Sequence, residues 1–363
     1  MIEFLCIAVA CGIFLMLWKS RLNYLALPKL PVTTAAPPPD LTIVIPARNE
    51  AHQIARAVKS FPGLPVVVVN DASTDETTTA ALAAGAKVIN APPLPPNAKG
   101  KPNACAAGAA LATTKWLLFV DADTWFEPNF AASLVNYAEA NSLQMVTAFL
   151  KQECLSIAEK TLLPYAFGLY FTGVSARSVN RQGSGASLAN GQCLLFLRSA
   201  YEQIGGHLAV IESVIEDVAM AQQAKKHNLP LRVMRGEHLG RVRMYDGAPA
   251  IWRGFQKNSF RFLQVNPIGG LQVVLSSILL TSWAPLIILG LRDYPTLNNP
   301  ALLITPTPVW LLFITPFLTL LPWYAGWGVL FAPFAIYFFQ LIALNGMLTT
   351  LTRRKTDWKG RGV

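Results

Sequence analysis

The chain has 363 residues, of which 53% are hydrophobic and only 14% charged, and its formal net charge is +10. This length exceeds one typical domain, and the apolar excess indicates that part of the chain lies in lipid. The five cysteines include no CxxC pair, so neither a disulfide framework nor a zinc site is indicated. The positive charge suits an anionic membrane face or a phosphate-bearing substrate, and no nucleic-acid partner is expected because no such module is visible.

The N-terminal stretch predicts a membrane anchor. Residues 2–18 are almost wholly apolar, and basic residues follow at Lys19, Arg21 and Lys29. A secretory signal carries its positive charge before the apolar core, so we expect an uncleaved anchor. Positive residues mark the cytoplasmic side of a membrane helix, which places the following domain in the cytoplasm.

From Leu41 onward, short β-rich runs alternate with helical stretches. Strands are predicted at Leu41–Ile45, Pro65–Val69, Lys87–Asn90 and Trp116–Val120, and helices at Glu50–Ser60, Thr74–Ala84, Lys101–Thr113 and Pro128–Ala140. This alternation predicts an α/β fold with a mostly parallel sheet and right-handed crossovers, as in nucleotide-binding proteins. Open sheets of this kind bind ligands at the carboxyl ends of their strands, so the residues there are the candidate site.

The apolar run Trp116–Val120 ends abruptly in Asp121 and Asp123. A continuous apolar run suits a strand that is buried on both faces of a parallel sheet. Two carboxylates at its end could hold a hard divalent cation, which would neutralise a diphosphate. The alternative is that Asp-Ala-Asp-Thr only turns the chain and caps a helix that starts near Pro128.

The second strand ends in a similar way. Asp71 follows four valines and could accept a hydrogen bond from a uracil imide or a ribose hydroxyl. The alternative is an Asx turn that caps the next helix, although Ser73 and Asp75 fit that role better. Lys101 lies between these strands and the carboxylate pair, where its charge could meet a phosphate or simply be solvated.

Five motifs in this order resemble those of the family 2 glycosyltransferases of GT-A fold: IPARNE, VVVVNDASTD, GKPNACAAGA, LLFVDADT and IESVIEDVAMA. Further pieces resemble the membrane-bound subgroup that glycosylates carotenoid acids and hopanoid-type lipids: NGQ (190–192), YEQIGGH (201–207), RMY (243–245), QKN (256–258) and WKGR (358–361). The resemblance covers nearly the whole chain. Ordered motifs are more specific than any one of them alone.

The resemblance implies a role for each matching position. The nucleoside pocket would be lined by Pro46, Arg48, Glu50 and Asp71, and Lys101 would face the diphosphate. The donor would be a nucleotide sugar, by resemblance UDP-glucose.

The resemblance also assigns the acidic residues downstream. Asp121 would contact the ribose or the sugar, and Asp123 would be the direct ligand of Mg²⁺ or Mn²⁺. In the Glu216–Asp217 pair, Asp217 would be the general base, because inverting transfer needs a carboxylate opposite the leaving diphosphate. The alternative is that both acids are favoured by the dipole of the helix they begin.

One departure from the family pattern concerns the QxxRW motif of processive members. Here Gln256 is followed by Lys-Asn-Ser-Phe, so the arginine and tryptophan are missing and a polymerising synthase is disfavoured. Lys257 or Arg261 are candidates to replace the missing cation.

The stretch from Leu155 to Asn190 leaves two interpretations open. It is densely apolar but contains glycines and charges, so it could lie in the membrane plane near the acceptor or form a buried core helix. Similarly, His207 could bind the sugar or acceptor, or serve as a hydrogen-bonded scaffold residue.

The C-terminal region predicts further membrane spans at 271–291, 302–323 and 329–351. Three crossings would leave the tail outside, whereas its basic residues favour the inside. The middle segment contains four prolines and could be broken or re-entrant, so the number of crossings stays open and a cytoplasmic tail is favoured. The predicted parts are an anchor (1–27), a Pro-rich linker (28–40), the catalytic domain (41–265), a membrane region (266–352) and a basic tail (353–363).

These expectations combine into a multi-pass cell-membrane enzyme whose catalytic domain faces the cytoplasm. It would be a metal-dependent inverting glycosyltransferase that moves a hexose from a nucleotide sugar to a lipid acceptor such as a carotenoid or terpenoid acid or alcohol. Two alternatives remain at this point: a polyprenyl-phosphate sugar synthase and a non-catalytic membrane scaffold that binds nucleotide sugars.

Overall fold

The computed structural model describes residues 2–35, 40–173, 175–258, 267–292, 307–351, 357–358 and 361–362. The chain divides into two compact units, each of which is described by itself. We call residues 26–153 with 175–244 the sheet unit, and residues 1–25, 154–174 and 245–363 the helical unit. Arg261 and most of the predicted basic tail lie outside the described residues, and so does the side chain of Lys257.

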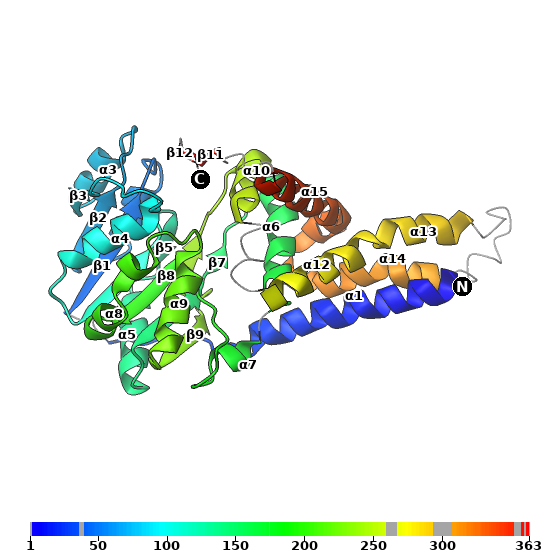
Figure 1. Cartoon of the computed structure of the whole chain (residues 1–363), viewed down its shortest axis with the longest axis horizontal. Helices are drawn as coiled ribbons and strands as arrows, with labels where there is room; N and C mark the ends of the chain where they lie inside the picture. The colour runs from blue at the N-terminus through cyan, green and yellow to red at the C-terminus, as the bar shows by residue number, and fades with distance from the viewer. Residues whose placement is uncertain are drawn as a thin grey trace. The chain divides into compact units, whose positions relative to one another are not determined.

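The sheet unit is built on a seven-stranded sheet with the order β3-β2-β1-β4-β8-β6-β9 (Figure 1). Its strands are β1 (Leu41–Ala47), β2 (Val66–Asn70), β3 (Lys87–Asn90), β4 (Trp116–Val120), β6 (Met145–Phe149), β8 (Cys193–Leu197) and β9 (Leu231–Arg235). All neighbours are parallel except β8, which runs antiparallel to both β4 and β6. The predicted mostly parallel α/β sheet is therefore confirmed.

The connecting helices follow the predicted alternation. They are α2 (Ile54–Lys59), α3 (Thr77–Ala83), α4 (Gly100–Ala110), α5 (Phe130–Ala140), α7 (Ala176–Val179), α8 (Arg198–Gln203), η1 (Gly206–Val210) and α9 (Glu216–Lys226). A second sheet contains β5 (Thr124–Phe126), β10 (Gly240–Val242) and β7 (Lys151–Gln152). The helix after β1 begins at Ile54 rather than Glu50. Asn49 has a φ of +53°, outside the helical region, and residues 51–53 form a turn in which the Glu50 carbonyl accepts from the Ile54 N–H at 2.9 Å.

Helices cover both faces of the main sheet. Ile43 and Ile45 belong to a buried core that includes residues of α2 and α5. On the other face, α4 lies so close to β1 and β2 that a Cβ added at Gly108 would be 2.4 Å from Val44 Cγ1 and 2.9 Å from Val69 Cγ2. Glycine is therefore needed at position 108, and this close packing fixes the helix that carries Lys101.

The helical unit contains α1 (Ile2–Leu25), α6 (Ile157–Tyr170), α10 (Gly247–Asn258), α12 (Pro267–Thr281), α13 (Trp283–Arg292), α14 (Thr307–Leu320), η3 (Leu321–Trp323), η4 (Gly326–Phe331) and α15 (Ala332–Leu351). Helix α1 packs against α12, α13 and α14, which lie side by side with it in Figure 1. A two-stranded sheet, β11 (Asp357–Trp358) and β12 (Arg361–Gly362), follows near the C-terminus.

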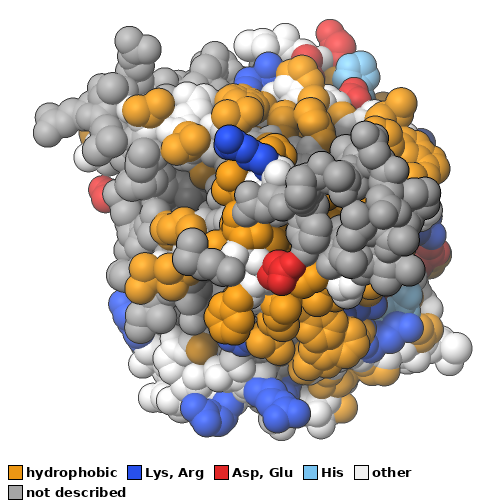
Figure 2. All heavy atoms as spheres, turned by 90° about the vertical axis from the view of Figure 1, so that its right-hand side faces the viewer, with side chains coloured by type: hydrophobic (Ala, Val, Ile, Leu, Met, Phe, Trp, Pro, Cys, Tyr) orange, Lys and Arg blue, Asp and Glu red, His pale blue; other side chains and the backbone are white. Residues whose placement is uncertain are grey.

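Three helices among the described residues are long and apolar enough to cross a membrane: Ile2–Leu25, Val274–Arg292 and Gly326–Gly346. The Pro-containing helix Thr307–Trp323 is apolar but shorter. Large hydrophobic side chains are exposed on these helices, for example Phe4, Leu15 and Ile288, and Figure 2 shows many such side chains on one face of the molecule. Exposed apolar surface of this kind is typical of helices that face lipid.

The ambiguous stretch after Leu155 begins with helix α6, which packs against α1, α10 and α15 inside the helical unit. Ser156 caps this helix by accepting from the Glu159 N–H, while the Glu159 carboxylate accepts from the Leu155 N–H at 2.7 Å. Leu162 and Tyr165 are buried there. This burial favours the core-helix interpretation over an amphipathic helix in the membrane plane.

Candidate active site

Polar residues follow the carboxyl ends of three neighbouring strands of the sheet unit. Strand β1 lies between β2 and β4 and is parallel to both. The Asp71 N–H donates to the Ala47 carbonyl at 2.8 Å, so the loops after β1 and β2 leave the sheet together. Arg48, Asp71 and Asp121 consequently share one edge of the sheet, where ligands bind in open α/β folds.

The loops after β1 and β2 are held together by hydrogen bonds. The Arg48 guanidinium donates to the Asp71 carbonyl at 2.7 Å. The Asn49 N–H donates to Ser73 Oγ at 3.1 Å, and Asn49 Oδ1 accepts from the Thr74 N–H at 2.8 Å. The Asp71 side chain lies 8% exposed within this frame. The predicted nucleoside residues Arg48 and Asp71 are thus brought together on a preformed platform.

The helices α3 and α5 begin at residues other than Asp71 and Asp123. Asp75, rather than Asp71, supports the start of α3, because its Oδ1 accepts from the Thr77 N–H at 3.1 Å. After Asp123 the chain enters strand β5, and the N-cap of α5 is Asn129. Asp123 therefore does not begin α5, and the carboxylate that accepts at the start of α3 is that of Asp75.

Lys101, in the first turn of α4, joins two carboxylates that come from different elements. Its Nζ lies 2.6 Å from Asp121 Oδ1 and 2.8 Å from Glu216 Oε1. The Lys101 side chain is 34% exposed, and Glu216 is 7% exposed. Burial alone would lower the pKa of Lys101, but the charges of Asp121 and Glu216 outweigh it and raise this pKa well above its usual value. Lys101 is a permanent cation at this site.

Asp217 follows Glu216 in the first turn of α9. Its Oδ2 accepts from the Gly191 N–H at 2.8 Å, and its Oδ1 accepts from the Val218 N–H at 2.8 Å. Burial and the neighbouring charge of Glu216 raise the pKa of Asp217 to about 6, while Lys101 and the two N–H donors oppose this rise. A carboxylate in this range can accept a proton near neutral pH. The helix dipole also favours both acids at the start of α9. A role of Asp217 as general base is compatible with this electrostatic preference.

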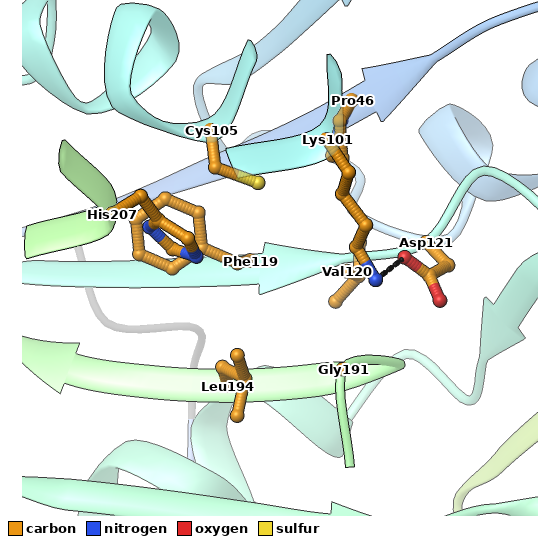
Figure 3. Close-up of a pocket in the computed structure, with 9 residues that line it drawn as sticks. All are labelled: Pro46, Lys101, Cys105, Phe119, Val120, Asp121, Gly191, Leu194 and His207. Atoms are coloured by element: carbon orange, nitrogen blue, oxygen red, sulfur yellow. Dashed lines mark ion pairs between the residues drawn. The ribbon is translucent and has the colours of Figure 1, made fainter. Parts of the chain in front are cut away.

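A small pocket adjoins this charged cluster (Figure 3). It is lined by Pro46, Lys101, Cys105, Phe119, Val120, Asp121, Gly191, Leu194 and His207. In Figure 3 the Lys101 side chain points from α4 toward Asp121, and His207 lies against Phe119 at the other end of the pocket. Polar groups therefore gather at the Lys101 end, whereas the His207 end is largely apolar.

His207 is a buried residue of the scaffold. Its Nδ1 lies 3.0 Å from the Tyr201 hydroxyl, which also accepts from the His207 backbone N–H at 3.0 Å. Because the hydroxyl accepts from that N–H, its own proton is available for Nδ1. Burial lowers the pKa of His207 to about 3, so the ring is neutral. This arrangement favours the scaffold interpretation of His207.

The residues at the strand edge suit a divalent cation that shares its ligands with a substrate. No group of three or more His, Cys, Asp or Glu side chains that could hold a metal occurs among the described residues. Mg²⁺ commonly binds through one or two carboxylates and completes its shell with substrate phosphates and water. The Asp121 carboxylate forms an ion pair with Lys101. Asp123 follows two residues later and offers a second carboxylate. The donor set fits a metal held jointly by Asp123 and a diphosphate.

The structure brings four predicted site residues into one cluster, namely Lys101, Asp121, Glu216 and Asp217. Pro46 lines the adjoining pocket, and the Glu50 N–H donates to Thr77 Oγ1 and so holds its loop in place.

Three residues of this region had no role in the sequence analysis: Gly191, Cys105 and Tyr201. The motif NGQ contained a signal for Gly191, because a glycine beside two polar residues can mark a close approach of the backbone.

We expect Tyr201→Phe to lower stability without removing activity. The hydroxyl serves two buried groups of His207, and leaving such groups unsatisfied costs about 1 to 3 kcal/mol. Thermal unfolding of the full-length protein in detergent should show a lower midpoint than for the control Tyr137→Phe, because no hydrogen bond of the Tyr137 hydroxyl occurs among the described residues. An unchanged midpoint with lost turnover would contradict the scaffold role and assign His207 to the substrate.

Comparisons with known proteins show what parts of this chain are similar to. Residues 42–205 match the family model "Glycosyl transferase family 2". The chain is 30% identical over 228 residues to 4,4'-diaponeurosporenoate glycosyltransferase of Staphylococcus aureus (strain USA300), a match that covers 60% of this chain and 60% of that protein. The chain thus spans about 60% of the length of this relative.

A solved structure has a similar fold. The mannosyltransferase PcManGT from Pyrobaculum calidifontis, solved with GDP-Man and Mn²⁺, is similar with a TM-score of 0.57 and 17% identity, over 97% of this chain and 99% of that one. At this identity the likeness concerns the fold. The structural likeness and the mostly parallel sheet show a GT-A-like fold, with residues 42–205 similar to family 2 glycosyltransferases and with apolar helices in the N- and C-terminal regions.

Proposed function

We propose that the protein is a membrane-bound, metal-dependent inverting glycosyltransferase that moves a hexose from a nucleotide sugar to a lipid acceptor. The proposed donor is UDP-glucose, and the proposed acceptor is a carotenoid or terpenoid acid or alcohol. The S. aureus relative is named for 4,4'-diaponeurosporenoate, which supports an acceptor of this kind. Basic residues after the first apolar helix, at Lys19 and Arg21, support a cytoplasmic catalytic domain.

One observation carries the proposal. The Lys101 ammonium joins Asp121, at the end of β4, to Glu216, at the start of α9. The strand-end side is where a nucleotide diphosphate belongs, and Asp217 beside Glu216 has the raised pKa of a proton acceptor. The donor half and the base therefore lie near one another, as is needed for the base to take the proton of an acceptor that attacks the donor sugar.

On the donor side, the chain's own residues bind and orient the nucleotide sugar. Asp71 and Arg48 lie on the hydrogen-bonded platform after β1 and β2, where a nucleoside would rest. Lys101 would offer its charge to the diphosphate, and Asp123 would hold the cation. A bound divalent cation would stabilise the negative charge of the departing diphosphate.

On the acceptor side, Asp217 accepts the proton. The acceptor oxygen forms a bond to the anomeric carbon, the bond from that carbon to the diphosphate oxygen breaks, and the nucleoside diphosphate leaves with the electron pair. An alcohol gives its proton to Asp217 during this step. A carboxylic acid is already ionised at neutral pH, so Asp217 would mainly orient it.

The function is tested by comparing lipid extracts of cells with and without the gene by mass spectrometry. We expect one glycolipid to disappear with the gene and to return with the wild-type chain. Asp123→Ala should fail to restore it, because loss of the metal ligand removes several kcal/mol of charge stabilisation. The matched control is Glu202→Ala, which removes an exposed carboxylate whose ion-pair partner in the described part of the chain is Arg198, and it should restore the glycolipid.

Other outcomes of this experiment would support one of the two alternative functions. Loss of a polyprenyl-phosphate sugar would identify a polyprenyl-phosphate sugar synthase. Unchanged lipids, together with no turnover of sugar nucleotides by the purified protein, would favour the scaffold. Full restoration by Asp123→Ala would contradict the assigned metal site.

The raised pKa of Asp217 predicts a pH dependence. A base must be deprotonated to act, so transfer to an alcohol should fall as the pH drops below about 6. Asp217→Asn should slow transfer to an alcohol by roughly 100-fold or more and abolish this acidic limb. Transfer to a carboxylic acid should be affected far less.

The measurement is the pH dependence of kcat/KM for an alcohol and an acid acceptor of the same lipid class. Equal losses for both acceptors would show that Asp217 does not act as a base. An acidic limb that survives in Asp217→Asn would assign it to another group.

A further inference from the structure

Gly191 lies where three charged side chains of the site, those of Lys101, Glu216 and Asp217, come together. A Cβ added at this position would be 2.8 Å from Lys101 Nζ, 3.2 Å from Glu216 Oε1 and 3.4 Å from Asp217 Oδ2. The first of these distances is shorter than real Cβ atoms tolerate. Any side chain at position 191 would therefore push the Lys101 ammonium out of its place between the carboxylates.

The backbone at Gly191 cannot readily move away to make room. The neighbouring Asn190 exchanges hydrogen bonds with Thr147 of β6, since its N–H donates to Thr147 Oγ1 at 2.9 Å and its carbonyl accepts from the same hydroxyl at 3.3 Å. On the other side, Gln192 is 2% exposed and leads directly into β8. The Gly191 N–H itself is held by Asp217 Oδ2 at 2.8 Å.

We infer that Gly191 is a positioning residue of the transfer reaction. Its lack of a side chain leaves the space in which Lys101 joins Asp121 to Glu216, and its N–H orients the Asp217 carboxylate. This inference rests on the proposed function and adds to it a residue that acts through Lys101. The Asn190–Gln192 loop is thereby part of the site.

The structure makes Gly191→Ala a clean test. Gly191 lies outside the left-handed region of φ, unlike Gly183 and Gly205 on the same part of the chain, so alanine suits its backbone. The atoms a methyl group would displace are the ends of flexible side chains rather than backbone. We therefore expect the variant to fold and to lose the Lys101 bridge.

The matched control is Gly185→Ala. Gly185 precedes β8 in the same loop, has no positive φ and has open space where a Cβ would lie. With UDP-glucose and Mn²⁺, turnover by the full-length protein in detergent should fall roughly tenfold in Gly191→Ala, the size of a typical coupling between contacting residues. It should stay at the wild-type level in Gly185→Ala. Equal turnover in the two variants would overturn the inference.

A double-mutant cycle with Lys101→Ala separates positioning from general damage. If Gly191 acts through Lys101, adding Gly191→Ala to Lys101→Ala should cost little further activity, because no ammonium remains to be displaced. Losses that multiply would show that Gly191 acts independently of Lys101 and would overturn the inference. The double variant also has room for the new methyl group, so it keeps the test valid if Gly191→Ala alone folds poorly.

The same cycle measured by thermal unfolding separates this inference from the proposed function. If the wild-type chain turns over no sugar nucleotide, the proposed function fails. The unfolding midpoints still report whether the effects of the two substitutions are coupled: non-additive midpoints support the geometry, and additive midpoints overturn it. If the wild-type chain is active and the effects of the two substitutions are additive, the proposed function stands and only the role of Gly191 is contradicted.

Discussion

The ion pairs of Lys101 with Asp121 and Glu216 are the interaction on which the site depends. The two carboxylates come from a strand end and a helix start that are far apart in the sequence, and Asp217 adds a third negative group beside them. Without a cation between them these groups would repel one another in a partly buried setting, where electrostatic energies exceed those in water. Lys101 therefore allows Asp121 on the donor side and Glu216 on the acceptor side to lie close together.

The position of Lys101 follows from packing some distance away. Helix α4 can approach β1 and β2 closely because residue 108 is a glycine, and Lys101 lies about two helix turns toward the N-terminus of this helix. The Gly191 loop leaves space for the ammonium at the other side. Two glycines on different elements thus determine where the positive charge lies, and the polar chemistry of the site depends on tight apolar packing beneath it.

The sequence contained enough information to predict the first half of the sheet. The apolar runs of β1, β2 and β4 identify buried parallel strands, and the rule that ligands bind at strand ends then selects Asp71, Asp121 and Asp123. Local patterns are sufficient here because each strand and its following loop are contiguous in the chain.

Other features could not be predicted because they depend on contacts between distant segments. The insertion of antiparallel β8 between β4 and β6 is not encoded in any local pattern, and neither is the pairing of Lys101 with Glu216. The turn that precedes α2 could not be predicted either, because Asn49 forms hydrogen bonds with the loop after β2. Likewise, only packing within the helical unit distinguishes α6 as a core helix.

The central claim is that one cleft of the sheet unit binds a nucleoside diphosphate and a cation beside the proton acceptor. The most direct test is an experimental structure of the protein with UDP and Mn²⁺, in which the anomalous signal of manganese locates the ion. We predict that the ion contacts the Asp123 carboxylate, that the diphosphate lies beside Lys101 and that the uracil lies near Asp71. A manganese ion and diphosphate bound away from these residues would contradict the account.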